Sequence, residues 1–310
     1  MKIAAVIFCF GLAVVGVIAS QEVQKRKAGA DQHPGLSPIQ VVTQRKEGQP
    51  MAFIAGGTFE MGIGEKELAK LQERFEIDDA KLFDDEKPKH EVSVGSFYMD
   101  KYLVTNAEFK KFVEQHPTWR RDRIAGELEN GHYLEHWKDN QIPAGRGEHP
   151  VVNVSWYAAV AYCQSEGKRL PSEAEWEFAA KGKLAGVFPW GDSPANKTRA
   201  NYSESGIGTT TAVGSYPANG YGLYDMAGDV WEYLADEWKA YASSAQQNPV
   251  GGGDLFASGD RYLRVRTRRV IRGGSFEGAP MNLWVEYRDS HPPENAKEFV
   301  GFRCAKPAEK

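Results

Sequence analysis

The chain has 310 residues and a formal net charge of -4, with 26% charged, 41% hydrophobic and 12% aromatic residues. This slightly acidic balance, without a long basic run, does not favour nucleic acid as a partner. Apolar and aromatic residues in these amounts predict a globular protein with a substantial core.

The first 20 residues have the pattern of a secretory signal peptide. An apolar run over residues 3–18 is followed by small residues that suit cleavage near Ala19/Ser20. The run is short for a membrane span, so an uncleaved anchor is the less favoured alternative. Cys9 lies within the run without a lipoprotein motif. We therefore expect a periplasmic or secreted protein with no membrane contact beyond this signal.

Composition divides the rest of the chain into two parts. Residues 21–50 are polar, interrupted by glycine and proline, and poor in aromatic residues, which is typical of a flexible linker. From residue 51 onward, aromatic residues and turn formers recur throughout. We predict a folded domain over residues 51–305.

The domain is predicted to contain few long helices and several short strands. Residues 53–55 and 91–94 are strand candidates. Thr105 and Glu108 have the spacing of a capping box. Helix-start signals precede three predicted helices: 107–114, 155–166 and a segment that follows the cap Ser172. This mixture indicates a loop-rich α+β fold.

His132 and His136 are four residues apart, a spacing that places two imidazoles on one helix face in some metal sites. No third ligand accompanies them, and Gly131 and Trp137 flank the pair. A surface segment without a metal is therefore the favoured interpretation.

The stretch from Ser215 to Trp238 concentrates turn formers, aromatic residues and acids. Asp225, Asp229 and Glu232 offer the hard oxygen atoms that calcium prefers, and free backbone carbonyls can complete its shell. A tight turn with solvated acids explains this loop, which we call the signature loop, equally well.

Several motifs follow one another in a characteristic order. They are GGTFEMG at 56–62, KPKH at 87–90, FYMD at 97–100, VTN at 104–106, PVVNVSW at 150–156, KRLPSEAEW at 168–176, FPWG at 188–191, NGYGLYDMAGDVWEYLADEW at 219–238, RGGS at 272–275 and GFRC at 301–304. In these motifs the chain resembles the formylglycine-generating enzyme (sulfatase-modifying factor) superfamily. The resemblance implies an α+β fold related to C-type lectin domains, with little regular secondary structure.

Cys163 and Cys304 are the two cysteines left after signal removal. Two free thiols are one possibility in an oxidising compartment, and a disulfide is the other. The resemblance implies that these two cysteines are paired, in a structural role.

The resemblance also implies structural calcium. Asp225 and Glu232 would contribute side chains, and Gly228 and Val230 would contribute carbonyl oxygens, to the family's second calcium site. Asn201 matches the opening ligand of the first site, but the loop after it lacks the family's aspartate.

Formylglycine-generating members hold Cu(I) between two cysteines after the G-G-S motif, because soft thiolates suit that ion. Aligned without gaps, those positions fall on Gly278 and Leu283, which bind no metal. Ser275 and Trp231 match pocket residues of the family. We therefore expect no thiolate copper site and no formylglycine generation by that route.

Glu286 and Glu277 are the acids nearest to the lost ligands and are the candidate catalytic bases, with Ser275 beside them. Desolvation in an aromatic cleft would raise the pKa of such a carboxylate. The expected walls and substrate-binding residues are Trp231, Trp284, Tyr287 and Arg288. The alternative is a solvated pair of Glu286 and Arg288 on a strand.

Three functions compete. The first is an exported oxidative or tailoring enzyme acting on a peptide or small metabolite, as in the pyoverdine-maturation branch that lacks the thiols. The second is a non-catalytic, calcium-stabilised module that binds a ligand or another exported protein. The third is a sulfatase-modifying paralogue. We expect the first; an open groove with ion-paired acids would favour the second.

Overall fold

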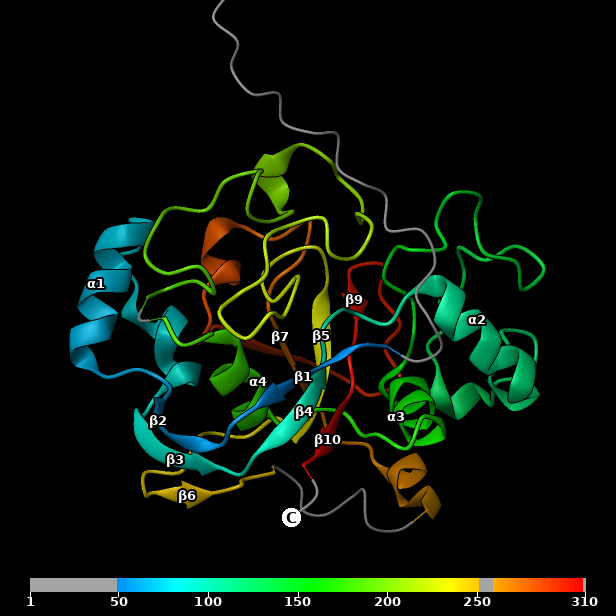
Figure 1. Cartoon of the computed structure of the whole chain (residues 1–310), viewed down its shortest axis with the longest axis horizontal. Helices are drawn as coiled ribbons and strands as arrows, with labels where there is room; N and C mark the ends of the chain where they lie inside the picture. The colour runs from blue at the N-terminus through cyan, green and yellow to red at the C-terminus, as the bar shows by residue number, and fades with distance from the viewer. Residues whose placement is uncertain (1–48, 185, 251–258, 309–310) are drawn as a thin grey trace, which may run out of the picture. The chain divides into compact units, whose positions relative to one another are not determined.

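The computed structural model describes residues 49–184, 186–250 and 259–308 (Figure 1). These residues lie within one compact unit, Glu47–Lys310. The signal peptide and the linker predicted from the sequence lie outside the described residues, apart from the last two residues of the linker. No helix in the described ranges is both long and apolar enough to span a bilayer.

Helices and strands alternate with long irregular segments. The α-helices are α1 (Glu65–Phe75), α2 (Asn106–Gln115), α3 (Trp156–Ser165) and α4 (Glu173–Ala180). The strands are β1 (Met51–Ile54), β2 (Gly57–Met61), β3 (His90–Val94), β4 (Phe97–Asp100), β5 (Trp231–Glu237), β6 (Gln246–Gln247), β7 (Arg269–Arg272), β8 (Arg288–His291), β9 (Val300–Gly301) and β10 (Ala305–Pro307). The predicted loop-rich α+β fold is confirmed.

The strands form three small sheets, with the orders β1-β4-β10, β2-β3-β6 and β8-β7-β5-β9. In the third sheet, β5 and β7 are antiparallel, with Glu232 opposite Arg272, whereas β5 and β9 are parallel. Figure 1 shows α1 on one side of the strands and α2 and α3 on the other. In this sheet β5 forms the last part of the signature loop, and the G-G-S turn follows β7.

The three predicted helices are present and begin where their caps predict. At α2, Thr105 Oγ1 accepts the N–H of Glu108 at 3.3 Å, and Glu108 accepts the N–H of Thr105 at 2.9 Å. Ser172 and Glu175 make the same reciprocal pair at α4. These side chains satisfy N–H groups that the first helical turn leaves without partners.

Helix α1 was not predicted from the sequence. Its buried residues Leu68 and Leu71, followed by the half-buried Phe75, recur at helical spacing and were the available signal. The segment with His132 and His136 is a run of turns and not a helix. His132 is exposed and contacts Glu135 at 2.8 Å, and burial lowers the pKa of His136 to about 4.

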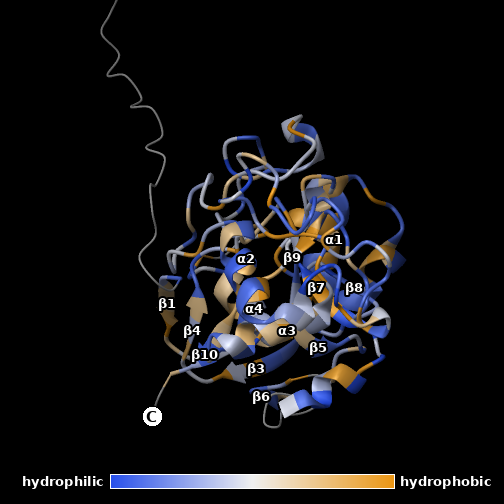
Figure 2. Ribbon diagram, turned by 90° about the vertical axis from the view of Figure 1, so that its right-hand side faces the viewer, coloured by the Kyte–Doolittle hydropathy of each residue, from blue (hydrophilic) through white to orange (hydrophobic). Residues whose placement is uncertain are grey.

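The largest core cluster surrounds α3, in which every residue from Trp156 to Cys163 is buried. Apolar colour is concentrated on the inner helices and strands in Figure 2, and the outer loops are mostly hydrophilic. A disulfide joins Cys163 to Cys304, 141 residues further along the chain, with a Cα–Cα distance of 5.7 Å. This is the pairing that the resemblance implies, and it connects α3 to the segment before β10.

Candidate functional site

The turn after β7 contains the G-G-S motif, and its shape depends on glycine. Gly274 has φ +74°, and a Cβ there would lie 2.7 Å from the carbonyl oxygen of Asn282. Glycine therefore fits where an L side chain would not. Ser275 follows with 1% of its surface exposed, and its Oγ accepts the N–H of Glu277 at 3.4 Å. Ser275 thus contributes to the turn itself.

The two positions that correspond to the copper thiolates cannot bind a metal. Gly278 has no side chain, and Leu283 is 1% exposed. Leu283 belongs to an apolar cluster whose other buried members are Phe188, Ala200, Tyr202 and Ala227. Apolar packing therefore occupies the place where the resemblance would put a thiolate, and the sulfur atoms of Cys163 and Cys304 are bonded to each other.

The two predicted bases have different surroundings. Glu277 is exposed to solvent, so it lacks the desolvated setting expected for it. Glu286 has a side chain that is 13% exposed, and its Oε1 lies 2.5 Å from Nζ of Lys181. Burial raises the pKa of Glu286, and the charge of Lys181 opposes that rise. Lys181 is also 3.4 Å from Glu177, so Glu286 is part of an internal ion-pair network.

Arg288, which was expected to bind substrate, is engaged by partners inside the protein. Its Nε and Nη2 each donate to Glu173 at 2.8 Å, and its Nη1 donates to two backbone carbonyls at 3.0 and 2.9 Å. The ring of Tyr241 lies 4.1 Å from the guanidinium. The alternative of a solvated Glu286–Arg288 pair also fails, because each side chain is buried with a different partner.

Arg272, at the end of β7, completes this network. It is fully buried, and its Nε and Nη2 donate to Glu173 and Glu177, each at 2.9 Å. Glu86 borders the same region: its Oε1 accepts the N–H of Arg288 at 3.1 Å, and its Oε2 has no partner in the described part of the chain. Burial raises the pKa of Glu86 to about 7, although Arg272 and Arg288 oppose the rise.

The aromatic residues expected to line a cleft are mostly packed in the core. Trp284 is 2% exposed and lies against Phe83, with 5.7 Å between ring centroids. Trp231 is 7% exposed, and its ring is 5.9 Å from that of Tyr287. Tyr287 is half-buried, and burial raises its pKa to about 12. Trp284 is therefore a core residue, and Tyr287 retains partial access to solvent.

The signature loop holds two buried acids whose oxygen atoms are only partly satisfied. Asp225 Oδ2 accepts the N–H of Gly214 at 2.7 Å, and Asp229 Oδ1 accepts the N–H of Thr211 at 2.7 Å. Asp225 Oδ1 and Asp229 Oδ2 are buried without a hydrogen-bond partner in the described residues. Burial raises the pKa of Asp225 to about 7, helped by the charge of Asp229, and burial raises that of Asp229 to about 6.

The expected calcium ligand Glu232 is engaged elsewhere. Nε and Nη2 of Arg303 donate to its two carboxylate oxygens at 2.6 and 2.9 Å, and both side chains are fully buried. This internal cation neutralises the carboxylate that the resemblance assigns to the metal. Arg303 belongs to the GFRC motif and Glu232 to the signature loop, so this ion pair links two family motifs.

The other expected ligands shape the loop around Asp229. Asn201 Nδ2 donates to Asp229 Oδ1 at 2.9 Å, and Asn201 Oδ1 accepts from Ser205 at 2.8 Å. Gly228 has φ +80°, and a Cβ there would meet the carbonyl of Asn201 at 2.4 Å. The carbonyl of Gly228 accepts the N–H of Val230 at 2.9 Å. Asn201 thus acts as a hydrogen-bonding support.

The orphaned oxygens provide a test of whether calcium fits this loop. An unpaired buried carboxylate is costly, and a divalent cation with oxygen ligands removes that cost. No cluster of three or more His, Cys, Asp or Glu side chains suited to a metal is found among the described residues. Calcium also accepts backbone carbonyls, so Asp225 and Asp229 fit the ion, whereas Glu232 does not.

A cavity of about 680 Å³ opens between α1 and the segment that contains FPWG. Its lining residues are Lys70, Glu73, Arg74, Phe75, Val187, Phe188, Asp192, Pro194, Ala195, Glu204 and Pro280. Its wall thus includes both apolar and charged residues. We call this cavity the α1 groove. Pro280 lies two residues after Gly278, so the groove borders the segment that carries the two thiolate positions.

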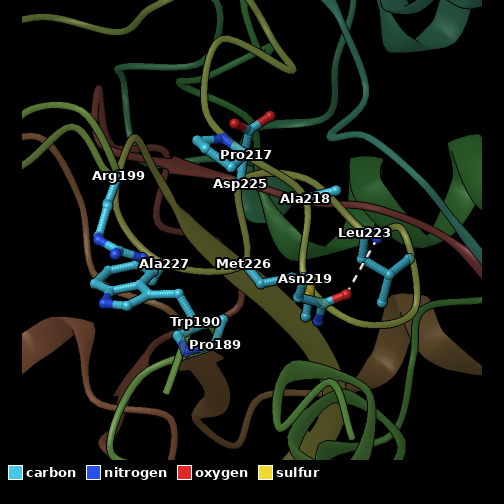
Figure 3. Close-up of a pocket in the computed structure, with 10 residues that line it drawn as sticks. All are labelled: Pro189, Trp190, Arg199, Pro217, Ala218, Asn219, Leu223, Asp225, Met226 and Ala227. Atoms are coloured by element: carbon cyan, nitrogen blue, oxygen red, sulfur yellow. Dashed lines mark hydrogen bonds between the residues drawn. The ribbon is translucent and has the colours of Figure 1, made fainter. Parts of the chain in front are cut away.

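A second, much smaller cavity of about 40 Å³ lies against the signature loop (Figure 3). It is lined by Pro189, Trp190, Arg199, Pro217, Ala218, Asn219, Leu223, Asp225, Met226 and Ala227. Figure 3 shows Arg199 against the indole of Trp190, with the carboxylate of Asp225 pointing away from both. We call this cavity the Arg199 pocket.

Comparison with known proteins places the fold and these motifs in a family. The sequence pattern of the sulfatase-modifying factor enzyme 1-like domain matches residues 39–308. The chain belongs to this family. It is 34% identical over 275 residues to a serine/threonine-protein kinase pkn1 of Chlamydia caviae, covering 83% of this chain and 38% of the kinase. The chain spans about two fifths of the length of the chlamydial kinases that it matches.

Relatives within the family include a protein named as an active enzyme and one named as inactive. The formylglycine-generating enzyme of Thermomonospora curvata is 34% identical and covers 82% of this chain and 92% of its own length. The inactive C-alpha-formylglycine-generating enzyme 2 of Bos taurus is 32% identical and covers 82% and 87%. Family membership therefore leaves the activity of this family member open.

Solved structures agree on the fold. Variable protein 1 of Treponema denticola superposes with a TM-score of 0.61 at 23% identity, covering 83% of this chain and 95% of that one. PvdO from Pseudomonas aeruginosa gives a TM-score of 0.61 at 24% identity, covering 83% and 94%. At these identities the likeness establishes the shared architecture and nothing about chemistry.

Three features of the site were missed from the sequence: Lys181 as the partner of Glu286, Arg303 as the partner of Glu232, and α1 as a groove wall. Lys181 follows the KRLPSEAEW motif and Arg303 belongs to the GFRC motif. Their positions in the sequence do not indicate which acid each one pairs with. The helical spacing of α1 was the one usable signal.

Proposed function

We propose that this family member is an exported protein that binds a peptide or a small molecule and does not oxidise it at a copper thiolate centre. The observation that carries the proposal is the place of Leu283, which packs in an apolar cluster where the resemblance requires a thiolate. Both cysteines of the described domain are used in a disulfide.

The surroundings of the acids support binding over general-base catalysis. Glu286 is paired with Lys181, Arg288 with Glu173, and Glu277 lies in solvent. None of these side chains lines the α1 groove or the Arg199 pocket. A base must reach its proton directly or through one water, so acids outside the cavities are poor candidates. The α1 groove, about 680 Å³ in volume, is of the size that small ligands occupy.

Calcium has a structural role in this proposal. Asp225 and Asp229, with nearby carbonyl oxygens, would hold the ion, which supplies positive charge and fixes the signature loop when bound. The proposal also places the mature protein outside the cytoplasm, after cleavage near Ala19/Ser20. N-terminal sequencing of the protein recovered from the periplasm or the medium tests this: a start within a few residues of position 20 is expected, and intact protein starting at Met1 contradicts it.

Mass spectrometry of exported peptides and metabolites tests binding against tailoring. A strain that lacks the gene is complemented with the wild type or with the Glu286→Gln variant, and the profiles are compared. The proposal expects no unprocessed precursor to accumulate in the deletion strain. A precursor that only the wild type clears would contradict it and establish the tailoring enzyme with Glu286 in its site.

Clearance of the precursor by both genes would also establish an enzyme, with Glu286 in a structural role. Purified mature protein supplies the positive arm of the test. Extracts of exported peptides are passed over immobilised protein, and the same peptides must elute chemically unchanged for the binding proposal to hold. Eluted peptides with an altered mass would contradict it.

A further inference from the structure

In the FPWG segment, Phe188 and Trp190 form an aromatic pair, and an arginine lies over each of the two rings. The rings of Phe188 and Trp190 are stacked, with 5.0 Å between centroids and 15° between planes. Arg74 lies 5.6 Å from the ring of Phe188, and Arg199 lies 5.9 Å from that of Trp190. Phe188 lines the α1 groove and Trp190 lines the Arg199 pocket, so this stack separates the two cavities.

The two arginines differ in how their donors are used. Arg74 Nη2 donates to the carbonyl of Asp192 at 2.8 Å and lies 3.8 Å from its carboxylate. The guanidinium of Arg199 lies over the indole of Trp190 but has no hydrogen bond or ion pair with any residue in the described ranges. A cation–π interaction with the indole favours this position of the guanidinium and leaves its N–H donors available.

The space beside Arg199 limits what those donors can bind. A single water needs about 10–15 Å³ of such volume. The pocket of about 40 Å³ therefore admits a group of a few atoms, which suits a carboxylate. Proline, alanine and methionine side chains form most of the remaining wall, a surface that suits a small aliphatic side chain.

Asp225 is the other charged residue in the lining, and it does not oppose an anion beside Arg199. Its Oδ2 accepts the N–H of Gly214 at 2.7 Å, and its carboxylate points away from the Arg199 guanidinium in Figure 3. The calcium ion proposed at this loop would also neutralise it. The guanidinium is therefore the group that determines the charge of the ligand at its end of the pocket.

We propose that Arg199 anchors the C-terminal carboxylate of a bound peptide, with a small apolar last residue against the pocket wall. The geometry of a guanidinium fork matches the two oxygens of a carboxylate. This inference rests on the proposed binding function and names the ligand class and its anchor. Because the guanidinium is already positioned on Trp190, less conformational entropy is lost on binding.

The test uses the mature, calcium-loaded protein and two probes, N-acetyl-alanyl-alanine and its C-terminal amide. Binding is measured by saturation-transfer NMR. We expect the acid to bind and the amide to bind about tenfold more weakly, because the amide removes the charge that Arg199 recognises. Arg199→Gln should weaken binding of the acid by about the same factor and leave the amide unchanged. Arg199→Lys, which keeps the charge and loses the fork, should fall between the two.

Lys197→Gln is the matched control, since Lys197 is an exposed cation two residues away that does not line the pocket. It should bind the acid as the wild type does. Thermal unfolding of each variant shows whether it is folded, and the Lys variant keeps the test valid if the Gln variant is not.

The outcomes separate this inference from the proposed function. Equal binding of acid and amide, or no change in Arg199→Gln, would overturn the anchor and leave the binding function intact. If no peptide probe binds and exported peptides fail to elute unchanged from immobilised protein, both fall. Displacement of the peptide acid by inorganic phosphate in the wild type would support an anion anchor at Arg199, and failure of phosphate to displace it would favour the carboxylate itself.

Discussion

Two groups of buried acids in this protein differ in how their charge is balanced. Behind β7 and β8, Glu173 and Glu177 are held by Arg272 and Arg288 at hydrogen-bonding distance. In the signature loop, Asp225 and Asp229 accept N–H groups, but each keeps one oxygen without a partner. Acids of both groups, Glu173 in the first and Asp225 and Asp229 in the second, lie in family motifs, so motif membership does not separate their roles.

The comparison shows which group has its negative charges fully paired within the chain. An internal cation neutralises the first group, and the chain alone supplies everything it needs. The second group gains stability from an external cation, because buried carboxylate oxygens without partners are costly. A buried acid that is already paired is a poor sign of a site, whereas an unpaired one points to a ligand.

The largest expected effect comes from breaking the complete network. Arg272→Met would leave Glu173 and Glu177 each without one of their cations in a fully buried setting. Removing one partner of a buried pair costs about 3–5 kcal/mol, so the free energy of unfolding measured in urea should fall by that amount. The control is Lys89→Met at the surface, where the pair with Glu67 is worth about 0–1 kcal/mol. Equal small losses for the two variants would contradict the comparison.

Glu86 borders the ion-pair network, and one of its carboxylate oxygens has no partner among the described residues. Its titration should make the stability of the protein depend on pH. Burial raises the pKa of Glu86 from its ordinary value of 4.5 to about 7, so on raising the pH the folded protein loses this proton at a higher pH than the unfolded chain does. The stabilising contribution of Glu86 to the free energy of unfolding is therefore full below pH 4.5 and is lost as pH rises through about 7. A shift of this size corresponds to about 3 kcal/mol.

Glu86→Gln removes that titration, so the difference in unfolding free energy between variant and wild type should grow in the variant's favour from pH 5 to pH 8. Urea denaturation at several pH values measures it. A difference that stays constant across this range would show that Glu86 does not titrate as its burial indicates.

Calcium should affect the second group and spare the first. At a hundredfold excess over its dissociation constant, a ligand that binds only the folded state adds about 2.7 kcal/mol to the free energy of unfolding. Calcium should therefore raise the melting temperature of the chelator-treated wild type and leave that of Asp225→Asn almost unchanged. Arg272→Met, if folded, should keep the full calcium effect. An unchanged wild-type melting temperature would contradict a calcium site at this loop.

The smallest effect is expected at Glu286. Glu286→Gln keeps a hydrogen-bonding group beside Lys181 and leaves that lysine with Glu177. A charged hydrogen bond is worth about 1.5–3 kcal/mol, and partial replacement by the amide reduces the loss to about 1 kcal/mol. Peptide binding should not change. Glu277→Gln, at an exposed position, is the control and should be neutral; loss of binding in Glu286→Gln would move the site toward Glu286.

Much of the fold could be predicted because its signals are local. Thr105 and Ser172 cap helices through residues three positions away, and ordered motifs identified the family. The candidate site was harder, because its acids looked alike in the sequence. Glu286 and Arg288 were considered as a pair since they are neighbours along a strand pattern, yet Lys181 lies 105 residues from Glu286.

The sequence by itself determined the family, the three capped helices and the absence of cysteine from the two thiolate positions, since each depends on residue identity at known spacing. Only the tertiary structure decided that Arg303 neutralises Glu232, that Trp284 packs on Phe83, and that α1 forms a groove with the FPWG segment. The physical reason is that an ion pair or a cavity wall depends on which side chains the folded backbone brings together. Sequence spacing carries no record of that proximity when the partners are scores of residues apart.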